Sequence, residues 1–128
     1  MIRITTTGIF VDNQQKALDF YTNILGFIIK DDIPVGEFRW ITIVTNGEEN
    51  GTELLLEPNN HPAAKKYQES IFLDGIPAQM FGVDNLEKEY NRLSNLGVAF
   101  TMKPTTMDGY KMAIFNDTCG NLVQLLQR

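Results

Sequence analysis

Two side chains of this sequence, Glu57 and His61, could support acid–base chemistry close together in the chain. Glu53 and Glu57 lie at the two ends of the run ELLLE, and His61 follows Glu57 by four positions. A carboxylate and an imidazole are the usual groups that move protons in enzymes. His61 also precedes Pro62, where a helix is expected to start, so a helix cap is its alternative role. Glu57 and His61 are therefore candidate catalytic bases, and the alternative stays open.

Few other residues have catalytic or metal-binding side chains. His61 is the only histidine and Cys119 the only cysteine. An internal disulfide, a thiolate zinc cluster and a two-histidine metal site are therefore excluded. Cys119 lies in the turn NDTCGN with no basic residue beside it, which predicts an inert thiol. The sequence has no glycine-rich phosphate loop and no nucleophile elbow.

Length and charge indicate the class of protein. The chain has 128 residues, 43% of them hydrophobic, which is enough for the core of one domain. Its net charge of -5 repels nucleic acid and anionic lipid, so neither is an expected partner. The N-terminal MIRITTTGIF has no long apolar region, and no stretch approaches the roughly 20 apolar residues of a membrane helix. We expect a soluble, cytoplasmic protein.

A weak internal repeat organises the chain. VDNQQKALDFYTNILGF begins at Val11 and VDNLEKEYNRLSNLGVAF begins at Val83. The offset is 72 at these valines (83 minus 11) and 71 at Gly26 and Gly97 (97 minus 26). Such similarity is typical of duplicated supersecondary units.

Each repeat predicts a strand, a helix and three more strands. Asn13 and Asn85 are placed to cap the helices, and Gly26 and Gly97 to end them. The expected elements of the first repeat are a strand at 3–11, a helix at 14–25, and strands at 27–30, 38–45 and 53–57. Those of the second are a strand at 78–83, a helix at 86–96, and strands at 99–103, 111–116 and 122–127.

The connections predict one domain over residues 1–128. Turns are expected at PVGE (34–37) and NGEENG (46–51). The first repeat covers about 1–58, a linker with a helix near 62–70 covers about 59–76, and the second repeat covers about 77–128. No flexible linker separates the repeats, so we expect them to share one core.

The repeated β-α-β-β-β unit, with ALDFYTNILGF after its first strand and DTCGNLVQLL near the end of the chain, resembles the vicinal oxygen chelate superfamily. This family includes glyoxalase I, bleomycin-resistance proteins and extradiol dioxygenases. RWITIV, ELLLEPNNHP and NDTCGN are also similar to small bacterial glyoxalase-like members. The resemblance covers essentially the whole chain. It implies an α+β fold in which two tandem units form curved mixed sheets, or half-barrels, around a cleft, with the helices outside.

The resemblance also indicates where a metal would bind. Metal-dependent members usually take ligands from the first and last strands of each unit, positions held here by Thr6, Leu55, Ala78 and Gln124. Divalent metals of this type prefer imidazole and carboxylate ligands. Thr6 and Gln124 are poor metal ligands, and the side chains of Leu55 and Ala78 have no atom that could bind a metal. We therefore expect no metal and no cofactor, with Gln124 as a hydrogen-bonded amide on the wall of the cleft.

Alternation along two strands predicts the remaining wall. In FRWITIV, Ile41 and Ile43 should pack beneath a helix, while Trp40 and Thr42 point to the concave side. The alternative is that the Trp40 side chain is buried in the core. In ELLLE, the flanking leucines should pack under the helix and leave Leu55 with the two glutamates on the concave face. Those glutamates must either be hydrated at the rim of the cleft or pair with a basic residue such as Arg39 or Lys111. The expected ligand-binding residues are Thr6, Trp40, Thr42, Leu55, Ala78, Met80, Tyr110, Met112 and Gln124.

Two functions from different classes follow. The first is a metal-free protein that binds a small apolar or aromatic molecule. The second is a lyase or isomerase that acts on a small oxygenated metabolite, with Glu57 or His61 as base. The missing ligands favour the first, because enzymes of this superfamily mostly depend on a metal. Exposed sheet edges and the resemblance also predict a homodimer.

Overall fold

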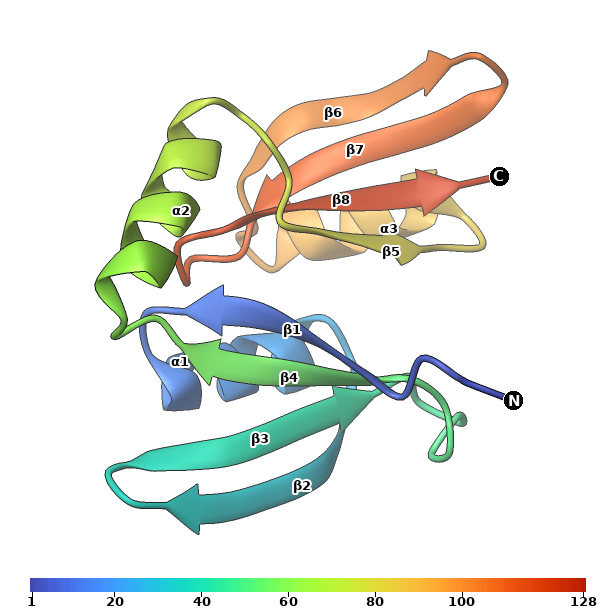
Figure 1. Cartoon of the computed structure of the whole chain (residues 1–128). Helices are drawn as coiled ribbons and strands as arrows, with labels where there is room; N and C mark the ends of the chain where they lie inside the picture. The colour runs from blue at the N-terminus through green and yellow to red at the C-terminus, as the bar shows by residue number, and fades with distance from the viewer. The chain divides into compact units, whose positions relative to one another are not determined.

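Two four-stranded sheets, each with a helix against one face, form the fold in the computed structural model, which describes residues 1–128 (Figure 1). The chain divides into two units, Met1–Lys65 and Lys66–Arg128. The helix α2 (Pro62–Leu73) begins in the first unit and continues into the second. The predicted α+β class with two tandem β-α-β-β-β units is confirmed. One shared core stays a prediction.

The first unit has strand order β1-β4-β3-β2. Its β1 pairs with β4 in parallel, and the other two pairings are antiparallel. Its elements are β1 (Thr6–Val11), α1 (Gln14–Asp19), a π-helix (Phe20–Ile24), β2 (Ile28–Val35), β3 (Phe38–Val44) and β4 (Glu53–Pro58).

The second unit repeats this topology with strand order β5-β8-β7-β6. Here β5 and β8 are parallel, and the other pairings are antiparallel. Its elements are β5 (Gln79–Gly82), α3 (Leu86–Asn95), β6 (Phe100–Met107), β7 (Tyr110–Asn116) and β8 (Leu122–Gln127).

Each unit buries one face of its sheet under its own helix. In the first, the buried sheet residues follow the predicted alternation and face the buried residues of α1. They are Ile9, Val11, Ile41, Ile43, Leu54 and Leu56, with Ala17 and Leu18 of α1. In the second, the equivalent set is Ala113, Phe115, Val123 and Leu125, with Leu86 and Leu93 of α3. The predicted helix-facing sides of FRWITIV and ELLLE are confirmed.

The predicted helix caps are present. The Asn13 side chain accepts a hydrogen bond from the Lys16 N–H at 2.9 Å, and the Asn85 side chain does the same for Lys88 at 3.1 Å. Both satisfy a backbone N–H that the first turn leaves free.

The one-residue change in repeat offset has a structural cause. From Val11 to Gly26 there are 15 steps (26 minus 11), and from Val83 to Gly97 there are 14 (97 minus 83). The additional residue lies where α1 widens into the π-helix, in which the Leu25 N–H reaches back five residues to the Phe20 carbonyl. A π-turn accommodates one additional residue without breaking the helix.

The strands β2 and β6 are longer than predicted. They continue to Val35 and Met107, past Pro34 and Pro104. Both are edge strands with an interrupted register, and proline is tolerated at a sheet edge because its missing N–H would face solvent. At the N-terminus, β1 begins at Thr6, three residues later than predicted.

Candidate ligand-binding site

Cross-strand pairs place four predicted site residues of the first unit on its helix-free face. Thr42 and Leu55 are directly paired across β3 and β4, and Leu55 also pairs with Gly8 of β1. Paired residues share a face, and alternate residues of a strand lie on the same side. Trp40 and Thr6 therefore lie on this face as well. The surface is distinct from the one that α1 covers.

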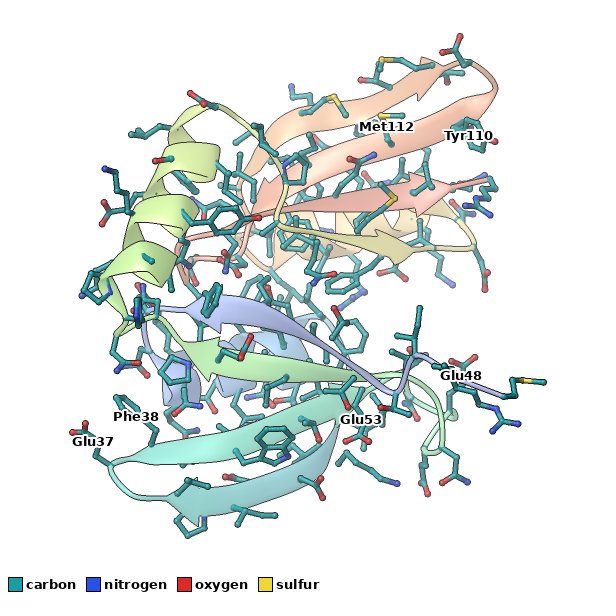
Figure 2. All side chains as sticks on the ribbon, in the orientation of Figure 1. Glu37, Phe38, Glu48, Glu53, Tyr110 and Met112 are labelled. Atoms are coloured by element: carbon teal, nitrogen blue, oxygen red, sulfur yellow. The ribbon has the colours of Figure 1, made fainter.

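Trp40 and Thr42 differ in exposure although they share a face. Trp40 is 41% exposed, so its ring lies outside the core, and it pairs across the sheet with Ile33, which is 51% exposed. Thr42 is fully buried, and its hydroxyl donates a 2.7 Å hydrogen bond to Glu53 Oε1. Figure 2 shows Glu53 at the start of β4. The face thus combines an exposed aromatic ring with a carboxylate fixed by a buried hydroxyl.

The two glutamates find partners other than the predicted basic side chains. Glu53 accepts from Thr42, and the Glu57 carboxylate lies over Gly8, where a Cβ atom would overlap it. Arg39 was one expected partner, but its guanidinium pairs with Asp32 at 2.6 Å. Its hydrogen bonds lower the pKa of Asp32 from the ordinary value. Of the options that the sequence left open for the glutamates, the ion pair with Arg39 is therefore not formed, because Arg39 pairs with Asp32.

The second unit has a matching helix-free face. Gln124 of β8 pairs with Met80 on one side and with Ile114 on the other. Met112 lies on the same face, and its sulfur accepts a 3.6 Å hydrogen bond from the Gln124 amide. Figure 2 shows Tyr110 and Met112 along β7. Met80 is 54% exposed and Tyr110 is 44% exposed, so this face offers apolar, polarizable surface.

The donor atoms at the four metal positions do not suit a divalent metal. Within the first unit, Thr6 and Leu55 supply one hydroxyl, and within the second, Ala78 and Gln124 supply one amide. Nowhere in the chain do three histidine, cysteine, aspartate or glutamate side chains gather as a metal site would require. Imidazole and carboxylate donors, which such metals prefer, are absent from these positions.

His61 acts as a helix cap. It is exposed, and its Nδ1 accepts a 3.1 Å hydrogen bond from the Ala63 N–H in the first turn of α2. No hydrogen bond joins His61 to Glu57. The capping role is the ordinary alternative that the sequence allowed.

A buried polar network, missed in the sequence, holds the turn before β8. Asp117 is fully buried, and its carboxylate accepts hydrogen bonds from the N–H groups of Cys119 and Asn121 and from the Asn121 side chain. Gln68 of α2 donates to the Cys119 carbonyl at 3.0 Å and to the Asn121 side chain at 3.1 Å. These bonds fix α2 to the turn. Cys119 itself is fully buried, as an inert thiol would be.

The tandem units, each a sheet with one helix-covered face and one free face, define the class of protein. The sequence model of the Glyoxalase/Bleomycin resistance protein/Dioxygenase superfamily matches residues 3–125. The chain belongs to this family. No helix of the chain has the length and apolar character that crossing a membrane requires.

Particular relatives support the assignment. The chain is 58% identical to the protein YurT of Bacillus subtilis (strain 168) over 127 residues, 99% of this chain and 100% of YurT. It is 30% identical to YetH of the same organism over 124 residues, 96% of each chain.

Solved structures of similar fold cover the whole chain. The crystal structure of UcmS2 has a TM-score of 0.85 at 29% identity and covers 98% of both chains. That of TnmS3, an antibiotic binding protein from Streptomyces sp. CB03234, has a TM-score of 0.75 at 24% identity and covers 99% of this chain and 96% of TnmS3. At that identity the second likeness shows the fold alone.

Proposed function

We propose that this protein binds a small apolar or aromatic molecule on the helix-free faces of its sheets, without a metal. The observation that carries the proposal is the exposure of Trp40 on the same face as a carboxylate held by Thr42. Trp40 is paired with the exposed Ile33, and adjoining exposed apolar side chains are the kind of surface patch that marks a binding site. Aromatic ligands gain affinity from such a surface by burying apolar area, at roughly 25 cal/mol per Å².

Charge on the same face selects among aromatic ligands. Glu53 and Glu57 are both half-buried, and Arg39 is occupied by Asp32. A dianion would meet two carboxylates, and the Arg39 guanidinium is already paired with Asp32, so its desolvation is poorly compensated. We therefore expect neutral or weakly cationic aromatic molecules to bind better than small dianions.

The second unit presents an apolar surface of its own. Met80 and Tyr110 are exposed, and Gln124 offers an amide that orients a polar group of the ligand. The fold is compatible with this role, because TnmS3, which shares it, is an antibiotic binding protein.

Elemental analysis of protein purified without added metal should find far less than one equivalent of nickel, zinc, iron or manganese.

The test uses the neutral probe 2-naphthamide and the dianion naphthalene-2,6-dicarboxylate. Binding is measured by calorimetry, and the indole N–H signal of Trp40 in a ¹⁵N NMR spectrum reports on the first unit, because the chain has one tryptophan. We expect the amide to bind and shift this signal, and the dianion to bind at least tenfold more weakly.

Two variants locate the site. Leu55→Arg places a charged side chain among the paired residues of the face, and Trp40→Ala removes the exposed ring. Both should weaken binding of 2-naphthamide at least tenfold. Asn60→Arg adds the same charge at an exposed position and should bind as the wild type does. Binding that is absent in the wild type, or unchanged in Trp40→Ala, would overturn the proposal.

The alternative is a lyase or isomerase with Glu57 as base. The observation in its favour is that the Glu57 carboxylate lies over Gly8 on the same face as Trp40. Turnover of a small hydroxy- or keto-acid by the wild type, lost in Glu57→Gln while binding of 2-naphthamide is kept, would favour this enzyme.

A further inference from the structure

The two repeats differ at equivalent positions of their free faces. Val11 and Val83 align the first strands, so TTGIFV in β1 corresponds to AQMFGV in β5. Gly8 of the first unit is thus replaced by Met80, and Phe10 is replaced by Gly82. Glycine and a large apolar side chain have exchanged places between the repeats.

The space above the two glycines is filled differently. Above Gly8, the Glu57 carboxylate occupies the place that a side chain would take. Above Gly82, a Cβ atom would meet nothing within 4 Å. The pairing is equivalent, because Phe10 pairs with Glu57 and Gly82 pairs with Leu126. The first unit therefore fills its glycine gap with its own side chain, and the second leaves the gap open.

The open gap forms a depression of about 560 Å³ on the second unit. It is lined by Met80, Gly82, Val83, Asp84, Leu126 and Arg128. Its lining combines apolar side chains and the bare glycine backbone with the charged side chains of Asp84 and Arg128. The two charged residues are exposed and make no ion pair with each other or with any other residue.

We propose that this depression is a subsite for a planar aromatic ring that carries a neutral group with both a donor and an acceptor, such as a carboxamide. The inference rests on the proposed binding function and names the ligand chemistry that suits the second unit. A flat ring fits against a strand at glycine, where no Cβ holds it away from the backbone. Met80 and Leu126 contact its faces and edge.

The charged rim determines the polar group of the ligand. Asp84 accepts a hydrogen bond from the amide N–H₂ group, and Arg128 donates to the amide oxygen. A carboxylate ligand would satisfy Arg128 and be repelled by Asp84, and an ammonium ligand would do the reverse. A neutral group with one donor and one acceptor satisfies both.

The experiment tests the subsite by replacing Gly82 with a larger residue. Gly82→Leu places a side chain in the open space, and the backbone there is not in the left-handed region that only glycine favours. The fold should therefore tolerate the change, and thermal unfolding should occur at or above the wild-type temperature, since glycine weakens a strand. Thr101→Leu, an exposed residue on β6 outside the depression, is the matched control.

Two readouts are followed with 2-naphthamide as the probe. Calorimetry gives the affinity, and ¹³C-methyl methionine NMR reports the Met80 methyl group, with Met1 as an internal reference. We expect the Met80 signal to shift in the wild type. Gly82→Leu should abolish that shift and weaken at least tenfold the binding that the Met80 signal reports, while Thr101→Leu leaves both unchanged. Asp84→Asn and Arg128→Gln should each weaken binding severalfold.

The outcomes separate this subsite from the proposed function. If 2-naphthamide does not bind the wild type and the Trp40 signal stays fixed, the proposed function itself is wrong. If the probe binds and shifts Trp40, yet Gly82→Leu binds equally well, the subsite alone is wrong. Should Gly82→Leu fail to fold, the Met80 shift in the wild type decides: its presence supports the subsite, and its absence overturns it.

Discussion

The buried carboxylate of Asp117 gives the sharpest prediction about stability. Its Oδ1 accepts from the N–H groups of Cys119 and Asn121 at 2.7 and 3.0 Å, and its Oδ2 accepts from the Asn121 side chain at 2.9 Å. In Asp117→Asn, one oxygen still serves both backbone groups. The other becomes an N–H₂ group that faces the donor of Asn121, so two buried donors oppose each other.

The expected cost follows from these contacts. Each buried polar group left without a partner costs about 1–3 kcal/mol, and losing a hydrogen bond to a charge adds to this cost. Removing the buried charge recovers part of its desolvation penalty. We expect Asp117→Asn to lower the free energy of unfolding by about 2–3 kcal/mol, a large fraction of the roughly 5–15 kcal/mol typical of a domain.

An exchange of the two side chains tests the mechanism. In the double variant Asp117→Asn/Asn121→Asp, the new amide donates to the new carboxylate, which still accepts from Gln68. Urea unfolding followed by circular dichroism should show recovery of most of the loss, with a coupling free energy of about 2 kcal/mol and an unchanged slope. The reasoning is refuted if Asp117→Asn has a free energy of unfolding within about 0.5 kcal/mol of the wild type. It is also refuted if the loss of free energy in the double variant equals the sum of the losses in the two single variants.

Three further predictions concern other parts of the molecule. Because Arg39 lowers the pKa of Asp32, their ion pair stabilises the fold above the ordinary aspartate pKa and is lost as pH falls through the lowered value. Asp32→Asn should therefore cost less than about 1 kcal/mol at pH 7 and nothing in strong acid, as measured by urea unfolding at both pH values. Gln14 donates to the carbonyls of Arg39 and Leu56 and accepts from the Arg39 N–H, so Gln14→Ala should cost about 1–3 kcal/mol in thermal unfolding, and an unchanged melting temperature would contradict this. We also expect a homodimer, and a light-scattering mass near one 14.5 kDa chain would argue against it.

The faces of the sheets could be predicted because packing against a helix imposes a period of two. ELLLE has three leucines, so composition alone does not say which of them are buried. The prediction that Leu54 and Leu56 lie under the helix is confirmed, since they are 7% and 0% exposed. In FRWITIV the alternation of Trp40 and Thr42 with the isoleucines indicated the two faces, but it left open whether Trp40 lies in the core, and its 41% exposure places it outside.

Features that depend on distant partners could not be predicted. Asp117 and Asn121 occur in a turn, where polar residues are ordinarily exposed. Gln68, about fifty positions earlier, covers the turn and buries both. The additional residue of the first helix was visible as the change of offset, but the sequence does not say whether a loop or a π-turn accommodates it.

The free faces differ between the repeats for a physical reason. On the helix-covered side, Val11 and Val83 hold the same place in the two repeats, and Val11 is fully buried while Val83 is half-buried. No helix of the unit packs against the free side, so the two repeats carry glycine at different positions there, Gly8 in the first and Gly82 in the second. In the first repeat the protein covers its glycine with Glu57, which leaves an acidic, aromatic face beside Trp40. In the second it leaves the glycine bare, which makes room for a ring. One duplicated unit thus yields two chemically different surfaces, one acidic and aromatic at Trp40 and one with an open glycine at Gly82.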